Sequence, residues 1–199
     1  MHRAFRDDMA QLCVLFGFCC GGQGVLADQP EWVLLRYRAP ALVEFASAFR
    51  TAPMQIFTSR FGTVEIETDD ILLFPLGIAG FEHVQHWVLL ADADNEAVAW
   101  LQSAQDPGVA LAVVSPRRFV PEYQVRVGRN QLSGLELSAT DEACVLAILA
   151  RHEGRLTLNL RAPLVLNLEG RLGRQVITTD EQPLQMDLTG ASASSRKIA

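Results

Sequence analysis

Short apolar runs separated by turn residues make up most of the chain after its first 53 residues. In residues 62–67 the apolar Val64 and Ile66 alternate with glutamates, which is the period of a half-buried β-strand. Residues 109–114 are apolar at every position and predict a central strand that is covered on both faces. Residues 143–150 have the Ala and Leu content of a helix, but we predict a strand because they continue the same series of short runs.

Prolines and turn residues mark where these strands should end. Pro75 must stop the run that begins at Ile71, because proline has no N–H to give to a sheet and fixes its own φ. Pro163 likewise predicts a break before residues 164–168. Asn130 should cap one short helix over residues 130–137. With a turn signal about every ten residues, the predicted fold is mainly all-β, a small antiparallel β-barrel-like or sandwich domain with one short helix.

The stretch at the centre of this pattern is residues 71–90, ILLFPLGIAGFEHVQHWVLL. Two glycines allow backbone turns in its middle, yet the loop around them keeps the apolar Ile78 and Phe81 where polar residues would be the default. Either these two side chains plug the core from a tight turn, or they are presented to a partner.

Composition fits one globular domain with a substantial core, since 49% of the 199 residues are hydrophobic and 20% are charged. The formal net charge is −6, and residues 54–189 contain 10 Arg against 18 Asp and Glu, which gives that part −8. An acidic domain is a poor direct binder of nucleic acid, because phosphate contacts need cations. The same charge suits a basic protein partner, or it serves only solubility.

The first 53 residues differ from the rest. Their apolar run at 12–20 and the following Val25-Leu26-Ala27 resemble a signal peptide, but two aspartates precede the run, and it is too short to span a bilayer. Three of the four cysteines lie here, and Cys144 is alone in the remainder, where it suits a small core side chain. A domain without a possible internal disulfide fits a reducing compartment.

Four motifs in order resemble the family of the flagellar assembly factor FliW. They are FPLGIAGFE at 74–82, WVLL at 87–90, WLQS at 100–103 and NLRAP at 159–163. The resemblance covers Met54 to Leu188 and implies a small β-barrel-like fold, which also favours a strand at 143–150. It divides the chain into an N-terminal extension at 1–53, a FliW-like β domain at 54–189 and a disordered tail at 190–199. We expect the extension to be disordered or to reflect a misassigned start, with Met54 as the true beginning.

The resemblance implies a function that works through protein surfaces. FliW-like proteins bind flagellin in the cytoplasm and also bind CsrA, a small RNA-binding repressor of translation. Holding CsrA relieves repression of the flagellin message, and accumulating flagellin takes up the FliW-like protein and frees CsrA. The expected protein is therefore cytoplasmic and not an enzyme, and it needs no cofactor or metal. It has flagellin and CsrA as partners, without direct contact to nucleic acid or membrane.

The candidate partner-binding residues come from two of the motifs: Ile78, Phe81, Glu82, Asn159, Arg161 and Pro163. In the functional interpretation, Arg161 anchors carbonyl or carboxylate groups of a partner with its fixed fork of donors. In the structural interpretation, Asn159 satisfies backbone groups of a loop and Arg161 pairs with a nearby carboxylate. The residues alone leave both interpretations open.

Two other classes of function remain as alternatives. A small β-barrel can hold a small molecule in an apolar cavity. A metal-dependent enzyme could use His83 and His86 together with His152, although the i, i+3 spacing of the first two does not place both rings on one face of a strand. The sequence contains no GxSxG motif, P-loop or Gly-rich dinucleotide turn.

Overall fold

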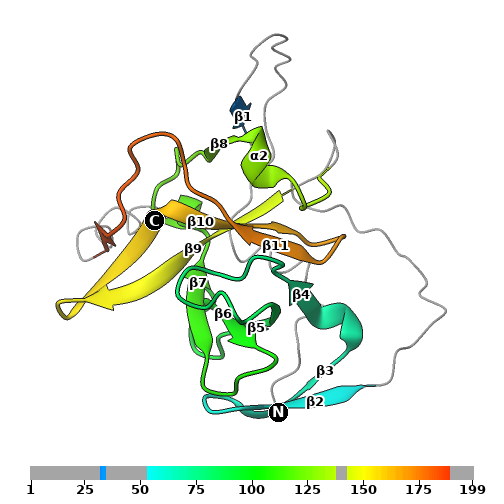
Figure 1. The fold of residues 1–199 in the computed structure, drawn as a ribbon. Coiled ribbons are helices and arrows are strands. Elements are labelled where there is room, and N and C mark those ends of the chain that lie inside the picture. Colours follow the sequence, from blue (N-terminus) through cyan, green and yellow to red (C-terminus); the bar gives the residue numbers. More distant parts are fainter. Residues whose placement is uncertain (1–31, 35–52, 138–142, 189–199) are drawn as a thin grey trace, which may run out of the picture.

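The computed structural model describes residues 32–34, 53–137 and 143–188 (Figure 1). The strands are β1 (Trp32–Leu34), β2 (Met54–Thr58), β3 (Gly62–Ile66), β4 (Ile71–Leu73), β5 (His86–Ala91), β6 (Ala99–Ser103), β7 (Ala110–Val114), β8 (Arg126–Gly128), β9 (Ala143–His152), β10 (Arg155–Asn167), β11 (Leu172–Gln175) and β12 (Met186–Asp187). The described helical segments are α2 (Arg129–Leu132) and two 3-10 turns, η1 (Thr68–Asp70) and η2 (Pro116–Arg118).

Seven strands close into a barrel in the order β11-β4-β5-β6-β7-β9-β10, because β10 pairs back with β11. All neighbours in this ring are antiparallel except β11 and β4, which run parallel and meet at Leu172 and Leu73. The long strand β10 also pairs with β12 near its beginning. The predicted small, mainly antiparallel β-barrel is confirmed, with one parallel pairing at the place where the barrel closes.

Apolar side chains fill the barrel interior. Successive residues of a strand point to opposite faces, so Trp87 and Leu89 of β5 point inward while Val88 and Leu90 point outward. The interior cluster draws on six of the seven barrel strands and the loop after β4: Leu72, Phe74, Ile78, Val84, Trp87, Leu89, Ala99, Leu101, Val113, Cys144, Leu146, Leu164 and Leu166. These side chains occupy the barrel interior, where a small-molecule carrier would need an open cavity.

Two further layers cover parts of the outside of the barrel. The β2–β3 hairpin packs the inward side chains Ile56, Val64 and Ile66 over the outer face of β5. Val64 and Ile66 are buried and Glu65 is exposed, which confirms the half-buried strand that the alternation predicted. A second layer runs from η2 through β8 to α2 and covers the outer faces of β9 and β10, with Tyr123 and Val125 fully buried there. Strand β1 pairs with β8, on this second layer.

Two predictions about local structure were wrong in detail. The helix covers only Arg129–Leu132 and starts after Gly128, so Asn130 lies inside it and does not cap it. It is short because the chain turns at Gly134, whose φ of 87° is left-handed. Strand β7 is central, between β6 and β9, but Ala110–Ala112 are half-buried, so the strand is not covered on both faces along its length.

Several expectations fall outside the described residues. These are the apolar run at 12–20, the cysteines before residue 32 and the tail from residue 190, so the division of the chain into extension, domain and tail stays a prediction. Within the described ranges, no helix is long and apolar enough to cross a membrane.

Candidate interaction site

The loop between β4 and β5 is held in one shape by its own backbone. Gly77 has a φ of 66°, and a Cβ atom placed on it would lie 2.5 Å from the Cα atom of Glu82, so no other residue fits there. The N–H of Phe81 donates to the carbonyl of Ile78 at 2.7 Å, and the N–H of Phe74 donates to the carbonyl of Gln85 at 2.7 Å. The loop is therefore a preformed surface feature.

The apolar side chains of this loop take different positions. Ile78 is 1% exposed and lies in the barrel interior, and the half-buried Phe81 packs edge-on against Trp87 with ring centroids 6.4 Å apart. These two therefore follow the interpretation in which the loop plugs the core. The side chain presented to solvent is Leu76, which is 64% exposed.

Strand β10 continues through the NLRAP motif, but its pairing with β9 slips there. Asn159 pairs with Ile148 and Leu164 with Leu146, so the four residues 160–163 stand opposite the single residue Ala147. The predicted break in the strand at Pro163 was wrong, because β10 continues through it. The proline lies in a bulge, where the hydrogen-bond ladder is interrupted and its missing N–H leaves no ladder bond unmade.

The polar backbone groups of this bulge find partners from several parts of the chain. The Asn159 side chain accepts a hydrogen bond from the N–H of Ala162 at 2.9 Å, which confirms the structural interpretation of this residue. The carbonyl of Leu160 accepts from the buried Tyr123 hydroxyl at 2.6 Å, and its N–H donates to the carbonyl of Pro183 at 3.0 Å. The bulge is thus fixed on both sides.

The bulge also reverses which side chains point outward. Before it, Leu158 and Leu160 face the outer layer, and after it, Val165 does so, while Leu164 and Leu166 point into the barrel. A strand without the slip would keep all even-numbered residues on one face. Before the bulge, the polar Thr157 is buried whereas the apolar Leu156 is 44% exposed.

Gln175 of β11 joins the two motif segments. Its side-chain oxygen accepts a hydrogen bond from the N–H of Ala79 at 2.9 Å, and its side-chain nitrogen donates to the carbonyl of Ala162 at 3.1 Å. One amide group therefore ties the loop at 76–82 to the bulge at 159–163. We call these two segments, together with residues 175–178, the Gln175 junction.

The Gln175 junction presents an apolar and a charged side chain to solvent. Residues 176–178 run beside the bulge, with the N–H of Val176 on the carbonyl of Pro163 and the N–H of Thr178 on the carbonyl of Arg161. Between them Ile177 is 60% exposed. Arg161 is exposed, and within the described part of the chain no carboxylate forms an ion pair with it. Its guanidinium is therefore available to acceptors of a partner.

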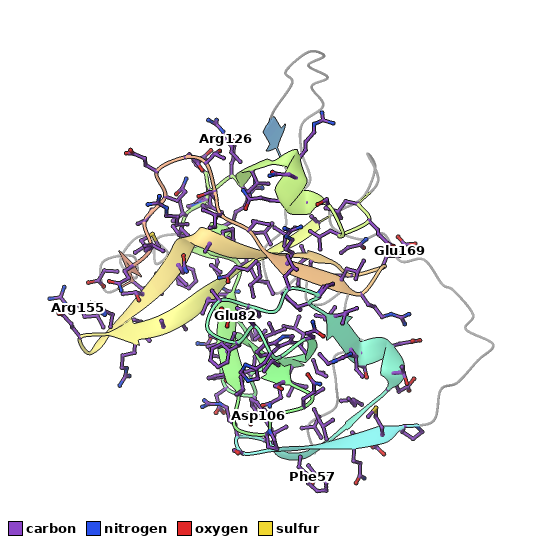
Figure 2. The ribbon with its side chains drawn as sticks, viewed as in Figure 1. Phe57, Glu82, Asp106, Arg126, Arg155 and Glu169 are labelled. Carbon is purple, nitrogen blue, oxygen red and sulfur yellow. The ribbon has the colours of Figure 1, made fainter. Side chains whose placement is uncertain are left out.

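Glu82 adds a negative charge at the edge of the loop, where Figure 2 labels it. Its carboxylate accepts a hydrogen bond from the N–H of Gly80 at 2.8 Å, and this bond lowers the pKa of the fully exposed carboxyl. Glu82 is therefore ionised at neutral pH, but one of its carboxylate oxygens is occupied by the hydrogen bond from Gly80.

Of the six predicted residues, the structure places Arg161 and Glu82 at the surface, Asn159 and Phe81 half-buried, and Ile78 and Pro163 in the core. Leu76, Gln175 and Ile177 are not among the residues predicted from the sequence. Leu76 carries a local signal, since a large apolar residue directly follows a proline in a turn. The other two carry none, because their neighbours in space are distant in sequence.

The histidines singled out as alternative metal ligands do not converge. His83 is exposed and His86 is half-buried, and the described residues include no group of three or more His, Cys, Asp or Glu side chains arranged to hold a metal ion.

Comparison with known proteins shows which family has these features. A family model described as FliW protein matches residues 55–188, which include the barrel, the β2–β3 hairpin and the Gln175 junction. The chain belongs to the FliW family of flagellar assembly factors. Strand β1 lies outside the residues that the family model matches.

Individual FliW proteins agree with this assignment. The flagellar assembly factor FliW of Bdellovibrio bacteriovorus is 39% identical over 129 residues, covering 64% of this chain and 74% of the relative. That of Moorella thermoacetica is 40% identical over 127 residues, covering 62% of this chain and 80% of the relative. A crystal structure of a flagellar assembly factor FliW matches with a TM-score of 0.61 and 31% identity, over 67% of this chain and 94% of that one.

Proposed function

We propose that this FliW-family protein binds flagellin and the translational repressor CsrA in the cytoplasm, and that it relieves repression of the flagellin message by holding CsrA. Membership of the FliW family over residues 55–188 is the observation that carries this proposal. The mechanism is partner switching, in which accumulating flagellin takes up the protein and frees the repressor. It requires binding surfaces and no catalytic step, cofactor or metal.

The Gln175 junction supports the proposal as a partner surface. Its backbone is fixed by hydrogen bonds before any partner arrives, so little conformational entropy is lost on binding. Leu76 and Ile177 offer apolar area, and Arg161 offers directional donors. Apolar area and an arginine are both common in the buried centre of protein interfaces.

The test measures binding of the full-length chain to purified flagellin and to purified CsrA, for the wild type and for Leu76→Ser and Arg161→Ala. Both side chains are exposed, so neither substitution should disturb folding. Each variant is expected to weaken at least one complex by about tenfold. Leu156→Ser is the matched control, because Leu156 is also exposed but lies near the far end of the β9–β10 hairpin, next to the Arg155 labelled in Figure 2.

The outcomes separate the function from the site. If the wild type binds neither protein, the proposed function is wrong. If it binds both and the two variants bind as tightly as the wild type, the function stands and the Gln175 junction is not the partner surface.

A further inference from the structure

Charge is distributed unevenly between the two halves of the folded domain. Residues 54–108 contain nine Asp and Glu against one Arg, for a net charge of −8, whereas residues 109–188 contain nine acidic residues and nine Arg, for a net charge of zero. The first half forms β2 to β6, which lie together in the lower part of Figure 1. The excess negative charge of the domain therefore belongs to one side of the molecule.

The single arginine of this acidic half is already engaged. The Arg60 guanidinium lies over the Trp100 ring at 3.7 Å from its centroid, and the Trp100 indole N–H donates to Asp92 at 2.7 Å. This arrangement pins the tip of the β2–β3 hairpin to β6. Among the described residues, the exposed carboxylates Glu65 and Asp94 form no ion pair, whereas Asp69 of the same half pairs with Arg171.

Within the described part of the chain, strand β2 has an open edge in the acidic half. It pairs there with β3 alone, and its sequence MQIFT contains no charged residue and no proline. Lysine and proline are the usual means by which proteins block such an edge. On the outward face of the same strand Phe57 is 69% exposed, the highest value among the large apolar side chains of the described residues. Figure 2 shows Phe57 projecting from the hairpin away from the barrel.

We propose that the free edge of β2, with Phe57 as its anchor, docks an extended basic segment of the partner that the protein holds, which under the proposed function is CsrA. An extended segment adds to an open edge through main-chain hydrogen bonds, and its alternate side chains meet the exposed face of the strand. Basic side chains of that segment lie on the same face of the hairpin as Glu65, which is one strand further in and pairs with Gln55 of β2. A second copy of this chain is a poorer occupant, because it would bring two halves of net charge −8 together.

This docking surface and the Gln175 junction are both connected to β5. The hairpin packs on the outer face of β5, and the loop of the Gln175 junction leads into β5. A repressor on β2 and flagellin on the Gln175 junction would then bind two different surfaces that are connected through β5. The inference rests on the proposed function and assigns the repressor to β2.

The experiment measures affinities of the full-length chain for purified CsrA and purified flagellin by calorimetry. Phe57→Ser is expected to weaken the CsrA complex by about tenfold or more and to change flagellin affinity by no more than about twofold. Glu65→Gln should weaken the CsrA complex and reduce its salt dependence, since raising the salt from about 0.1 M to 1 M shortens the Debye length from about 10 Å to about 3 Å. The controls are Leu156→Ser and Glu122→Gln, both at exposed positions in the neutral half.

Each outcome decides the proposal. Wild-type binding to CsrA together with unchanged affinity of folded Phe57→Ser would refute docking at β2 and leave the proposed function intact. Loss of flagellin binding instead of CsrA binding in this variant would refute the assignment of the partner. A wild type that binds neither protein would refute the proposed function and this inference with it.

Discussion

Gly173 closes the barrel by giving room to the ring of Phe74. A Cβ atom placed on Gly173 would lie 2.3 Å from the Cε2 and Cζ atoms of that ring. Phe74 is fully buried and packs edge-on against Trp87 with ring centroids 6.4 Å apart. Gly173→Ala must therefore shift either the ring or β11, at the parallel pairing where the barrel closes.

The expected cost of Gly173→Ala is about 1 to 3 kcal/mol of unfolding free energy, the usual range for overpacking a core. Urea unfolding followed by tryptophan fluorescence measures it, because Trp87 lies in the same cluster. Phe74→Leu provides the partner variant, since a smaller side chain removes the clash. In the double variant the two costs should fall short of their sum by about 1 kcal/mol or more.

Gly108→Ala serves as the control for this measurement. A Cβ atom there would meet only the Asp106 side chain at 3.4 Å, an ordinary contact, so its effect should stay within about 0.5 kcal/mol. The reasoning is refuted if Gly173→Ala unfolds at the same urea concentration as the wild type. It is also refuted if the costs of Gly173→Ala and Phe74→Leu simply add.

Three further predictions concern the bulge, the Gln175 hydrogen bonds and the β9–β10 turn. Tyr123→Phe leaves the buried Leu160 carbonyl without its donor and should cost about 1 to 3 kcal/mol by urea unfolding. Burial raises the pKa of Tyr123, so the unfolded state loses the hydroxyl proton at a lower pH than the folded state does. The contribution of the protonated hydroxyl to stability is therefore complete below the unfolded pKa of about 10 and is lost as the pH rises above it. Tyr123→Phe should flatten this alkaline decline in stability. Gln175→Ala should speed hydrogen exchange at the Ala79 amide, and an unchanged rate would show that the amide bridge is not formed. Glu153 has a left-handed φ of 49° before Gly154, so Glu153→Asn should raise the unfolding free energy by about 0.5 to 1 kcal/mol, and a loss of stability would contradict this turn assignment.

The sequence predicts the strands well because their signals are local. Alternation identifies β3, and Pro75 ends the run at β4 as expected. The choice of a strand at residues 143–150 is confirmed by β9, although its composition favours a helix. In that case burial on two faces, inside the barrel and under the outer layer, overrides helix propensity.

The features that the sequence does not predict depend on contacts between distant residues. The register slip in β10 depends on Tyr123 and Pro183, which bind the backbone of Leu160 from outside the strand. Gln175 and Ala79 are separated by 96 positions, so no local pattern relates them. The motifs also do not indicate which of their residues are exposed. The predicted Ile78 and Pro163 are buried, whereas the exposed side chains nearby are those of Leu76 and Arg161.

The most direct test of the account is a displacement titration. Purified CsrA is first bound to the full-length chain, and purified flagellin is then added while free CsrA is measured by its binding to a labelled target RNA. The account predicts that the chain alone prevents RNA binding by CsrA and that flagellin restores it in proportion to the amount added. A chain that captures neither protein, or RNA binding that is indifferent to its presence, would contradict the central claim that this protein acts by occupying its partners.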